Sequence, residues 1–193
     1  MIAHEHIRPI KIKDFFFVGM IVIITSLFLF VGNFIFPPTH SFIISLFFIV
    51  CGMNLTVYLT KKTGIAALFY VLTAIFTFPL NDLGVVGGGK LLTLFFAAFV
   101  FEIIFLFLKF HFHSIPLDMI IGTSLSIASI PLISAFSLSL ELASSFPTAL
   151  LNFILLAFSV GLGSSVIMFV IWHYIEKTKF IIKLESWLMS LGR

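Results

Sequence analysis

Long apolar runs separated by short polar stretches dominate the sequence and predict membrane-spanning helices. About 20 apolar residues cross the roughly 30 Å hydrocarbon core of a bilayer as a helix, and six runs reach or approach that length. The predicted spans are residues 15–36, 41–59, 64–80, 90–110, 117–140 and 147–175. The third is short, whereas the sixth, at roughly 43 Å, must tilt or protrude from the bilayer. The pattern therefore predicts an all-α bundle of six membrane helices.

Residues that start or interrupt helices mark several of these boundaries. Asp14 precedes the first span and is a suitable N-cap. The pair Pro37 and Pro38 closes that span, and the pair Lys61 and Lys62 closes the second. Pro131 lies inside the fifth span, where we expect a kink, because proline lacks the N–H that a helix interior requires.

The composition excludes a soluble protein. Of the 193 residues, 61% are hydrophobic and only 10% are charged, whereas a soluble domain carries roughly 45–50% apolar and about 25% charged residues. The length suits one membrane domain, predicted over residues 15–176. It lies between a tail of residues 1–14 and an amphipathic segment of residues 177–193. The single cysteine, Cys51, lies in an apolar run and forms no disulfide within the chain.

The positions of the basic residues predict the orientation of the bundle. Of the 11 lysine and arginine residues, only Lys90 falls on one side of the predicted spans. The others are Arg8, Lys11, Lys13, Lys61, Lys62, Lys109, Lys177, Lys179, Lys183 and Arg193. By the positive-inside rule both termini are cytoplasmic. We therefore expect a multi-pass protein of the cell membrane, with the connection between the third and fourth spans outside.

That external connection, NDLGVVGGGK, resembles a phosphate-binding loop but lacks its essential last residue. Gly84, Gly89 and Lys90 match the pattern G-x-x-x-x-G-K-[ST], and Leu91 stands where Ser or Thr should bind magnesium. Because the loop follows a membrane helix and faces away from the cytoplasm, we exclude nucleotide binding. The glycines instead predict a flexible lid, formed by Gly84, Gly87, Gly88 and Gly89. Lys90 then either snorkels to the membrane surface or contacts an anionic or polar ligand.

Glu102 is the most informative polar residue within a span. It lies seven residues before Lys109, so roughly 10 Å inside the cytoplasmic boundary. A carboxylate at that depth is costly and usually faces the protein interior or a wet cavity. Two interpretations stay open: Glu102 binds a ligand, or it is a structural carboxyl, neutral or hydrogen-bonded to a serine or threonine on a neighbouring helix.

The fifth and sixth spans carry stripes of small residues. In the fifth span the stripe consists of Gly122, Ser126, Ser129, Ser134, Ser137 and Glu141. It either packs against another helix or lines a polar cavity. In the sixth span Ala157, Gly161 and Ser165 form one ridge, and Ser159 and Gly163 form a second. These ridges pack within the chain or against another subunit.

The C-terminal segment, residues 177–193, has apolar residues at three- and four-residue spacing and predicts an amphipathic helix at the membrane surface. Trp187 would lie at headgroup level. The segment either anchors the chain to the membrane or docks a partner.

No combination of residues predicts an enzyme, a cofactor or a nucleic-acid partner. Glu102 has no histidine at its own depth, and the serines of the fifth span have no obvious base. His4 and His6 lack a third metal ligand at a suitable spacing. We therefore expect a non-enzymatic membrane protein without a metal site.

Two adjoining stretches resemble the substrate-binding S components of energy-coupling factor (ECF) vitamin transporters. KKTGIAALFYVLTAIFTFPL, residues 61–80, is similar to a segment in which a basic-x-Gly element opens a short, alanine-rich third helix. GGGKLLTLFFAAFVFEIIFLFLK, residues 87–109, resembles the fourth helix, in which a glutamate commonly stands as Glu102 does here. The first span lacks the A-x-x-x-A ridge by which that family contacts its transmembrane coupling subunit.

The resemblance implies that external loops close over a ligand cavity among helices four, five and six. A small vitamin or vitamin precursor would bind there, and the protein would topple in the membrane while bound to a coupling subunit driven by ATPases. The expected ligand-binding residues are Asn81, Asp82, Lys90, Glu102, Ser126, Ser129 and Ser134. The alternative function is a scaffold that holds a partner through Gly161, Ser165 and Trp187.

Overall fold

The structure, a computed structural model, describes residues 10–107, 111–112, 115–137, 146–178 and 181. Six helices follow one another: α1 (Ile12–Ile35), α2 (Pro38–Thr60), α3 (Ile65–Phe76), α4 (Gly88–Phe107), α5 (Leu117–Ser137) and α6 (Phe146–Ile175). Two short strands, β1 (His111–Phe112) and β2 (Ile115–Pro116), pair antiparallel between α4 and α5. Five of the helices are long and apolar enough to cross a membrane, and α3, with 12 residues, is shorter. The predicted all-α membrane bundle is confirmed.

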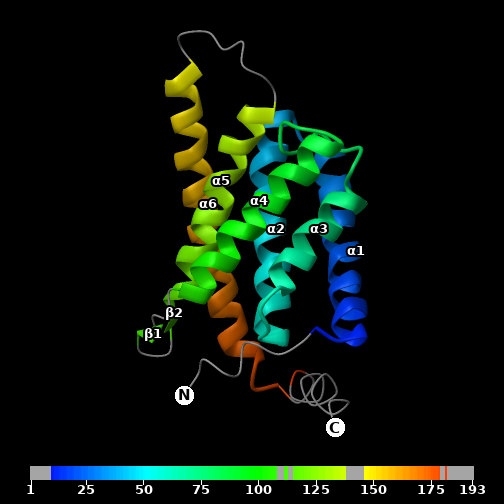
Figure 1. The fold of residues 1–193 in the computed structure, drawn as a ribbon, viewed down its shortest axis with the longest axis vertical. Helices are drawn as coiled ribbons and strands as arrows, with labels where there is room; N and C mark the ends of the chain where they lie inside the picture. The colour runs from blue at the N-terminus through cyan, green and yellow to red at the C-terminus, as the bar shows by residue number, and fades with distance from the viewer. Residues whose placement is uncertain (1–9, 108–110, 113–114, 138–145, 179–180, 182–193) are drawn as a thin grey trace.

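The helices run alternately up and down, so the bundle has two distinct ends (Figure 1). We call the end with the start of α1, the β1–β2 hairpin and the end of α6 the basic end. The opposite end, with the α1–α2 and α3–α4 connections, is the loop end. Each half of the bundle takes the name of its end.

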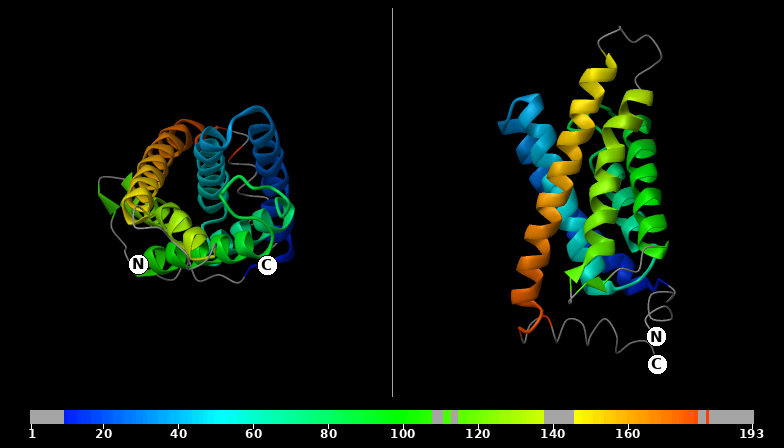
Figure 2. Two further views of the ribbon diagram at one scale, coloured as in Figure 1. Left: turned by 90° about the horizontal axis from the view of Figure 1, so that it is seen from above. Right: turned by 90° about the vertical axis from the view of Figure 1, so that its left-hand side faces the viewer.

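The helix neighbours define a closed ring in which α2 lies between α1 and α6 (Figure 2, left). Around the ring α1 packs on α2, α2 on α6, α6 on α5, α5 on α4, α4 on α3 and α3 on α1. Contacts of α2 with α3 and α5 cross the ring. Apolar side chains buried inside include Val22, Ile49, Phe69, Phe101 and Ile127.

Local sequence explains where α2 and α3 begin and end. Pro38 is the first residue of α2, a position where the missing N–H costs nothing. The helix ends at Lys61, which adopts a left-handed backbone with φ of 52°. Gly64, with φ of 83°, then starts α3. The left-handed region favours glycine, so Gly64 suits this tight connection.

Two boundaries beside the α3–α4 connection differ from the sequence prediction. Helix α3 ends at Phe76, earlier than the predicted 80, and α4 begins at Gly88 rather than at 90. Gly88 and Gly89 therefore lie in the first turn of α4, so they are not part of the predicted lid loop. Helix α5 continues through Pro131. Helix α6 has 30 residues and runs obliquely to the bundle axis (Figure 2, right), as its length predicts.

Several predictions concern residues outside the described part of the chain. These are the amphipathic C-terminal helix beyond Thr178, with Trp187, and the tail with His4 and His6. The side chains of Ser137 and Glu141, from the predicted stripe, also lie outside the described part of the chain.

Candidate functional site

Helix α4 places a carboxylate at the beginning of α3. The Oε1 atom of Glu102 accepts hydrogen bonds from the backbone N–H of Gly64 at 2.9 Å and of Ala67 at 3.4 Å. The first N–H groups of a helix have no partner within the helix, and a negative charge there also complements the helix dipole. Glu102 is half-buried and caps α3 from a neighbouring helix. Its partners are backbone groups, not the serine or threonine that the structural interpretation expected.

The same helix places an ammonium group at the other end of α3. Lys90 is completely buried and forms an ion pair with Asp82. Its Nζ atom also donates to the carbonyl oxygens of Thr77 at 3.1 Å and Leu80 at 3.5 Å, just beyond α3. A positive charge is favourable at a helix C-terminus. The predicted snorkelling of Lys90 to the surface is wrong, because this side chain is 0% exposed.

The α3–α4 connection is anchored into the bundle at several points. The side chains of Leu83 and Val85 are buried in the core. The N–H of Gly87 donates to the carbonyl of Phe78 at 3.0 Å. Gly84 and Gly87 have φ of 77° and 63°, which a residue with a side chain would adopt only at a cost. The glycines thus shape a folded connection at the loop end.

Asn81, which was predicted to bind the ligand together with Asp82, lies on the surface. Asp82, its neighbour in sequence, is buried. The structure therefore separates these two adjacent residues.

A hydrogen-bond network joins three helices in the basic half. Asn54 of α2 donates to the hydroxyl of Ser165 of α6 at 3.3 Å. The hydroxyl of Thr123 of α5 lies 3.0 Å from the side-chain oxygen Oδ1 of Asn54 and also donates to the backbone carbonyl of Met119 at 2.7 Å. All three side chains of this network are buried, and polar contacts of this kind hold membrane helices together. Sequence reasoning did not identify Thr123, because one threonine in an apolar helix gives no distinctive pattern.

The serine stripe of α5 begins as a packing surface. The Ser126 hydroxyl donates to the Ala97 carbonyl of α4 at 2.6 Å and lies 3.0 Å from the Tyr70 hydroxyl of α3. A Cβ on Gly122 would lie 3.3 Å from a side-chain atom of Ile104 of α4. Among the predicted ligand residues, Ser126 is thus engaged by two neighbouring helices.

Further along the stripe the pattern changes. Ser129 donates to the carbonyl of Ser126 in its own helix at 2.6 Å. Ser134 is buried, and its hydroxyl has no hydrogen-bond partner. The stripe is therefore a packing surface at Ser126 and carries an unpartnered hydroxyl near the loop end.

Five buried side-chain oxygen atoms in the described part of the chain have no hydrogen-bond partner. They belong to Ser26, Ser45, Thr73, Ser134 and Asp82, in the last case Oδ2. Each of the first four is closer in sequence to the loop end of its helix than to the basic end. Asp82 lies in the α3–α4 connection itself. Buried polar groups are nearly always partnered, so this one-sided distribution identifies the loop half as the candidate ligand site.

The two small-residue ridges of α6 have different environments. A Cβ on Gly161 would lie 3.0 Å from the Ser124 Cα of α5, so α5 and α6 pack closely there. Ser165 is buried and belongs to the basic-half network. Of the two alternatives for this ridge, the structure shows packing within the chain at Gly161 and Ser165. By contrast, no atom lies within 4 Å of a Cβ on Gly163, and Ser159 is exposed.

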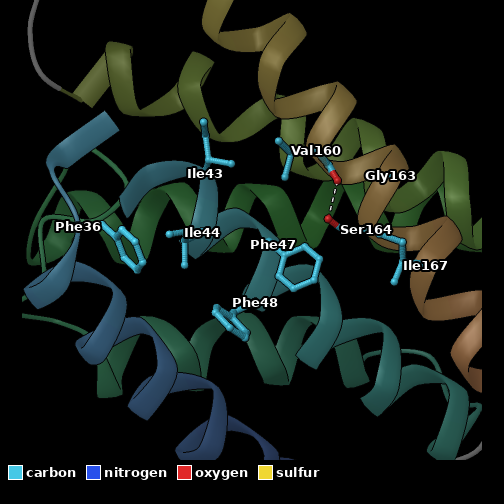
Figure 3. Close-up of a pocket in the computed structure, with 9 residues that line it drawn as sticks. All are labelled: Phe36, Ile43, Ile44, Phe47, Phe48, Val160, Gly163, Ser164 and Ile167. Atoms are coloured by element: carbon cyan, nitrogen blue, oxygen red, sulfur yellow. Dashed lines mark hydrogen bonds between the residues drawn. The ribbon is translucent and has the colours of Figure 1, made fainter. Parts of the chain in front are cut away.

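An apolar groove lies between α2 and α6 (Figure 3). Its volume is about 590 Å³. The residues that line it are Phe36, Ile43, Ile44, Phe47, Phe48, Val160, Gly163, Ser164 and Ile167. The Ser164 hydroxyl donates to the Val160 carbonyl at 2.6 Å, so it is not free to bind a polar ligand. The groove suits hydrocarbon and is distinct from the polar site at the loop end.

Within the described residues, no group of three histidine, cysteine, aspartate or glutamate side chains could hold a metal ion. No protein-family model, curated protein or solved structure matches this chain.

Proposed function

We propose that this protein is a substrate-binding membrane subunit for the uptake of a small polar molecule, such as a vitamin or vitamin precursor, across the cell membrane. The observation that carries the proposal is the set of five unpartnered buried oxygens in the loop half. A polar ligand entering from the loop end would supply the missing partners. Unmet hydrogen bonds in a buried site are costly, so a ligand that supplies these partners would be bound favourably.

The rest of the bundle supplies the rigidity that such a site needs. The Asn54 network fixes three helices below the site. Glu102 and Lys90 attach both ends of α3 to α4. Binding groups held by such contacts lose less entropy when a ligand arrives, and this improves affinity.

The resemblance of residues 61–109 to ECF S components supports the same function and extends it to partners. In that family transport requires a coupling subunit and ATPases, and we propose the same arrangement here. Because α1 lacks the A-x-x-x-A ridge, contact with the coupling subunit would use a different surface.

The direct test is to identify a bound molecule. The protein would be purified in mild detergent, and small molecules released by denaturation would be analysed by mass spectrometry. We expect one polar compound at near-stoichiometric amounts. The amount of this compound bound to the protein should fall in a variant that carries both Thr73→Val and Ser134→Ala. It should be retained in Ser124→Ala, whose hydroxyl donates only to the carbonyl of Ile120 in its own helix. A clean protein that binds no small molecule would refute the proposal.

The scaffold function keeps one specific observation in its favour. Ser159 is exposed and Gly163 borders the groove between α2 and α6, and nothing in this chain requires a glycine at position 163. Membrane helices approach closely at such small residues. If Gly163→Leu abolished capture of a membrane partner from cells and no small molecule were bound, the scaffold would be the better assignment.

A further inference from the structure

The chemistry around Asp82 restricts what kind of ligand the loop half can bind. This inference rests on the function proposed above and concerns the same site. It starts from the hydrogen bonds of Lys90, because among the described residues Lys90 is the only lysine or arginine at the loop end.

Lys90 has no donor left for a ligand. An ammonium group has three N–H donors and no acceptor. One goes to Oδ1 of Asp82, one to the Thr77 carbonyl and one to the Leu80 carbonyl. The pair with Asp82 also neutralises its charge. Lys90 therefore cannot serve as the anion contact that its position in the sequence suggested.

Asp82 has an acceptor left. Its Oδ1 atom is occupied by Lys90, whereas Oδ2 is buried and has no hydrogen-bond partner. A carboxylate oxygen only accepts hydrogen bonds. Its complement is an N–H or O–H donor, and charge-assisted bonds to carboxylates are among the strong ones.

An anionic group at this place would face the partial negative charge of Asp82 Oδ2, and among the described residues no unpaired lysine or arginine at the loop end would offset it. In a poorly hydrated interior such like-charge contacts are strongly unfavourable. The hydroxyl of Thr73 lies roughly 6 Å along α3 from Thr77. It can either donate a hydrogen bond to a ligand or accept one from it. It therefore adds polarity without selecting an anion.

We propose that the ligand of this site is an uncharged or positively charged molecule that donates a hydrogen bond to Oδ2 of Asp82, and that anionic forms of the same molecule are rejected. The selectivity resides in one oxygen atom, because the paired lysine is already saturated.

The experiment uses matched probes that differ in an anionic group. Thiamine, pyridoxine and riboflavin would be compared with thiamine diphosphate, pyridoxine 5′-phosphate and flavin mononucleotide. Binding to the full-length protein in nanodiscs would be measured by calorimetry. In every pair for which binding is detected, we expect the unphosphorylated member to bind on the order of 10-fold or more tightly. If mass spectrometry identifies a bound molecule, it would be compared with a phosphorylated form of itself, and the unphosphorylated form should again bind more tightly.

Asp82→Asn supplies the decisive variant. Lys90 would hold the amide oxygen, so the amide nitrogen would take the place of Oδ2 and donate instead of accept. The ranking within each pair should then shift toward the anionic member, by on the order of 10-fold. Ser124→Ala, which removes only a hydrogen bond to the carbonyl of Ile120 in its own helix, should leave the ranking unchanged.

The outcomes separate this inference from the proposed function. Tight binding of an anionic member to the unmodified protein, or an Asp82→Asn ranking identical to the original, overturns the inference alone. If no probe binds and no small molecule is recovered, both fall. If Asp82→Asn does not fold, the ranking by the unmodified protein decides.

Discussion

In the basic half of the bundle the amide of Asn54 has Thr123 and Ser165 as partners, whereas in the loop half the hydroxyls of Thr73 and Ser134 have none. Both halves are built from the same apolar helices and bury polar side chains from them. The basic half uses those side chains to join helices, as in an ordinary membrane bundle. The loop half leaves several of them without a hydrogen-bond partner. Under the proposed function, the basic half maintains the fold and the loop half receives the ligand.

The two charged residues of α4 that contact the ends of α3 also differ between the basic half and the loop half. Glu102, toward the basic end, is half-buried and bonded to two backbone N–H groups. Lys90, toward the loop end, is fully buried and needs Asp82 to be neutral. Removing one charge should therefore cost much more at the loop end than at the basic end.

The largest effect is expected for Lys90→Met. It leaves Asp82 as an unpaired buried carboxylate, and breaking a buried pair by removing one partner typically costs about 3–5 kcal/mol. The unfolding free energy would be measured in bilayers or micelles by reversible denaturation.

The matched control for Lys90→Met adds Asp82→Leu. Replacing both partners of a buried pair with apolar residues is often neutral, so the double variant should recover most of the loss. Equal stability of the single and double variants would mean that the pair is not buried as described.

The next largest loss of stability is expected for Gly161→Ala. The added Cβ would lie 3.0 Å from the Ser124 Cα, a backbone atom that can move only if α5 and α6 separate. Overpacking of this kind costs about 1–3 kcal/mol, and the Asn54 network should loosen with it. Gly163→Ala is the control: its Cβ would meet no atom, so unfolding should be unchanged or slightly harder. Equal changes in stability for Gly161→Ala and Gly163→Ala would contradict the close packing of α5 and α6 at Gly161.

The sequence predicted the bundle well because membrane spans carry strong signals. Lengths, prolines and the distribution of lysines place six helices and two ends with few errors. The rotation of each helix was not predictable, since side chains that face lipid are as apolar as those that face the core. Gly161 and Gly163 show this: both belong to small-residue ridges, and only the structure distinguishes the packed ridge from the open one.

The site was less accessible from the sequence. Glu102 was identified as important, but its partners are backbone N–H groups, which every residue carries and no pattern reveals. The Lys90–Asp82 pair had a usable signal: two opposite charges eight residues apart flank a glycine-rich connection between apolar helices. Sequence reasoning interpreted Lys90 either as a snorkelling residue or as a ligand contact, and did not pair it with Asp82.

Glu102→Ala tests the milder end of the charge comparison. It removes the cap of α3 and leaves two N–H groups without their acceptor, which typically costs about 1–2 kcal/mol. The loss should be local, so hydrogen exchange should accelerate at Gly64 and Ala67. Glu102→Gln keeps a side-chain oxygen that can accept the hydrogen bonds, so its stability should lie between that of Glu102→Ala and that of the unmodified protein. Ligand binding should survive in both variants. Loss of binding in a variant with normal exchange would restore the prediction that Glu102 contacts the ligand.

The smallest effect, and the sharpest test of the two halves, compares two serines of one helix. Ser126→Ala removes a bond to the Ala97 carbonyl and a partner of Tyr70, so it should destabilise the protein by about 0.5–1.5 kcal/mol. Ser134→Ala removes a hydroxyl without a partner, so the change should stay within about 0.5 kcal/mol. With ligand present the order should reverse, because only Ser134 is available to bind it. Similar stability losses without ligand would mean that the Ser134 hydroxyl is as fully bonded as that of Ser126, and the division between the halves would disappear.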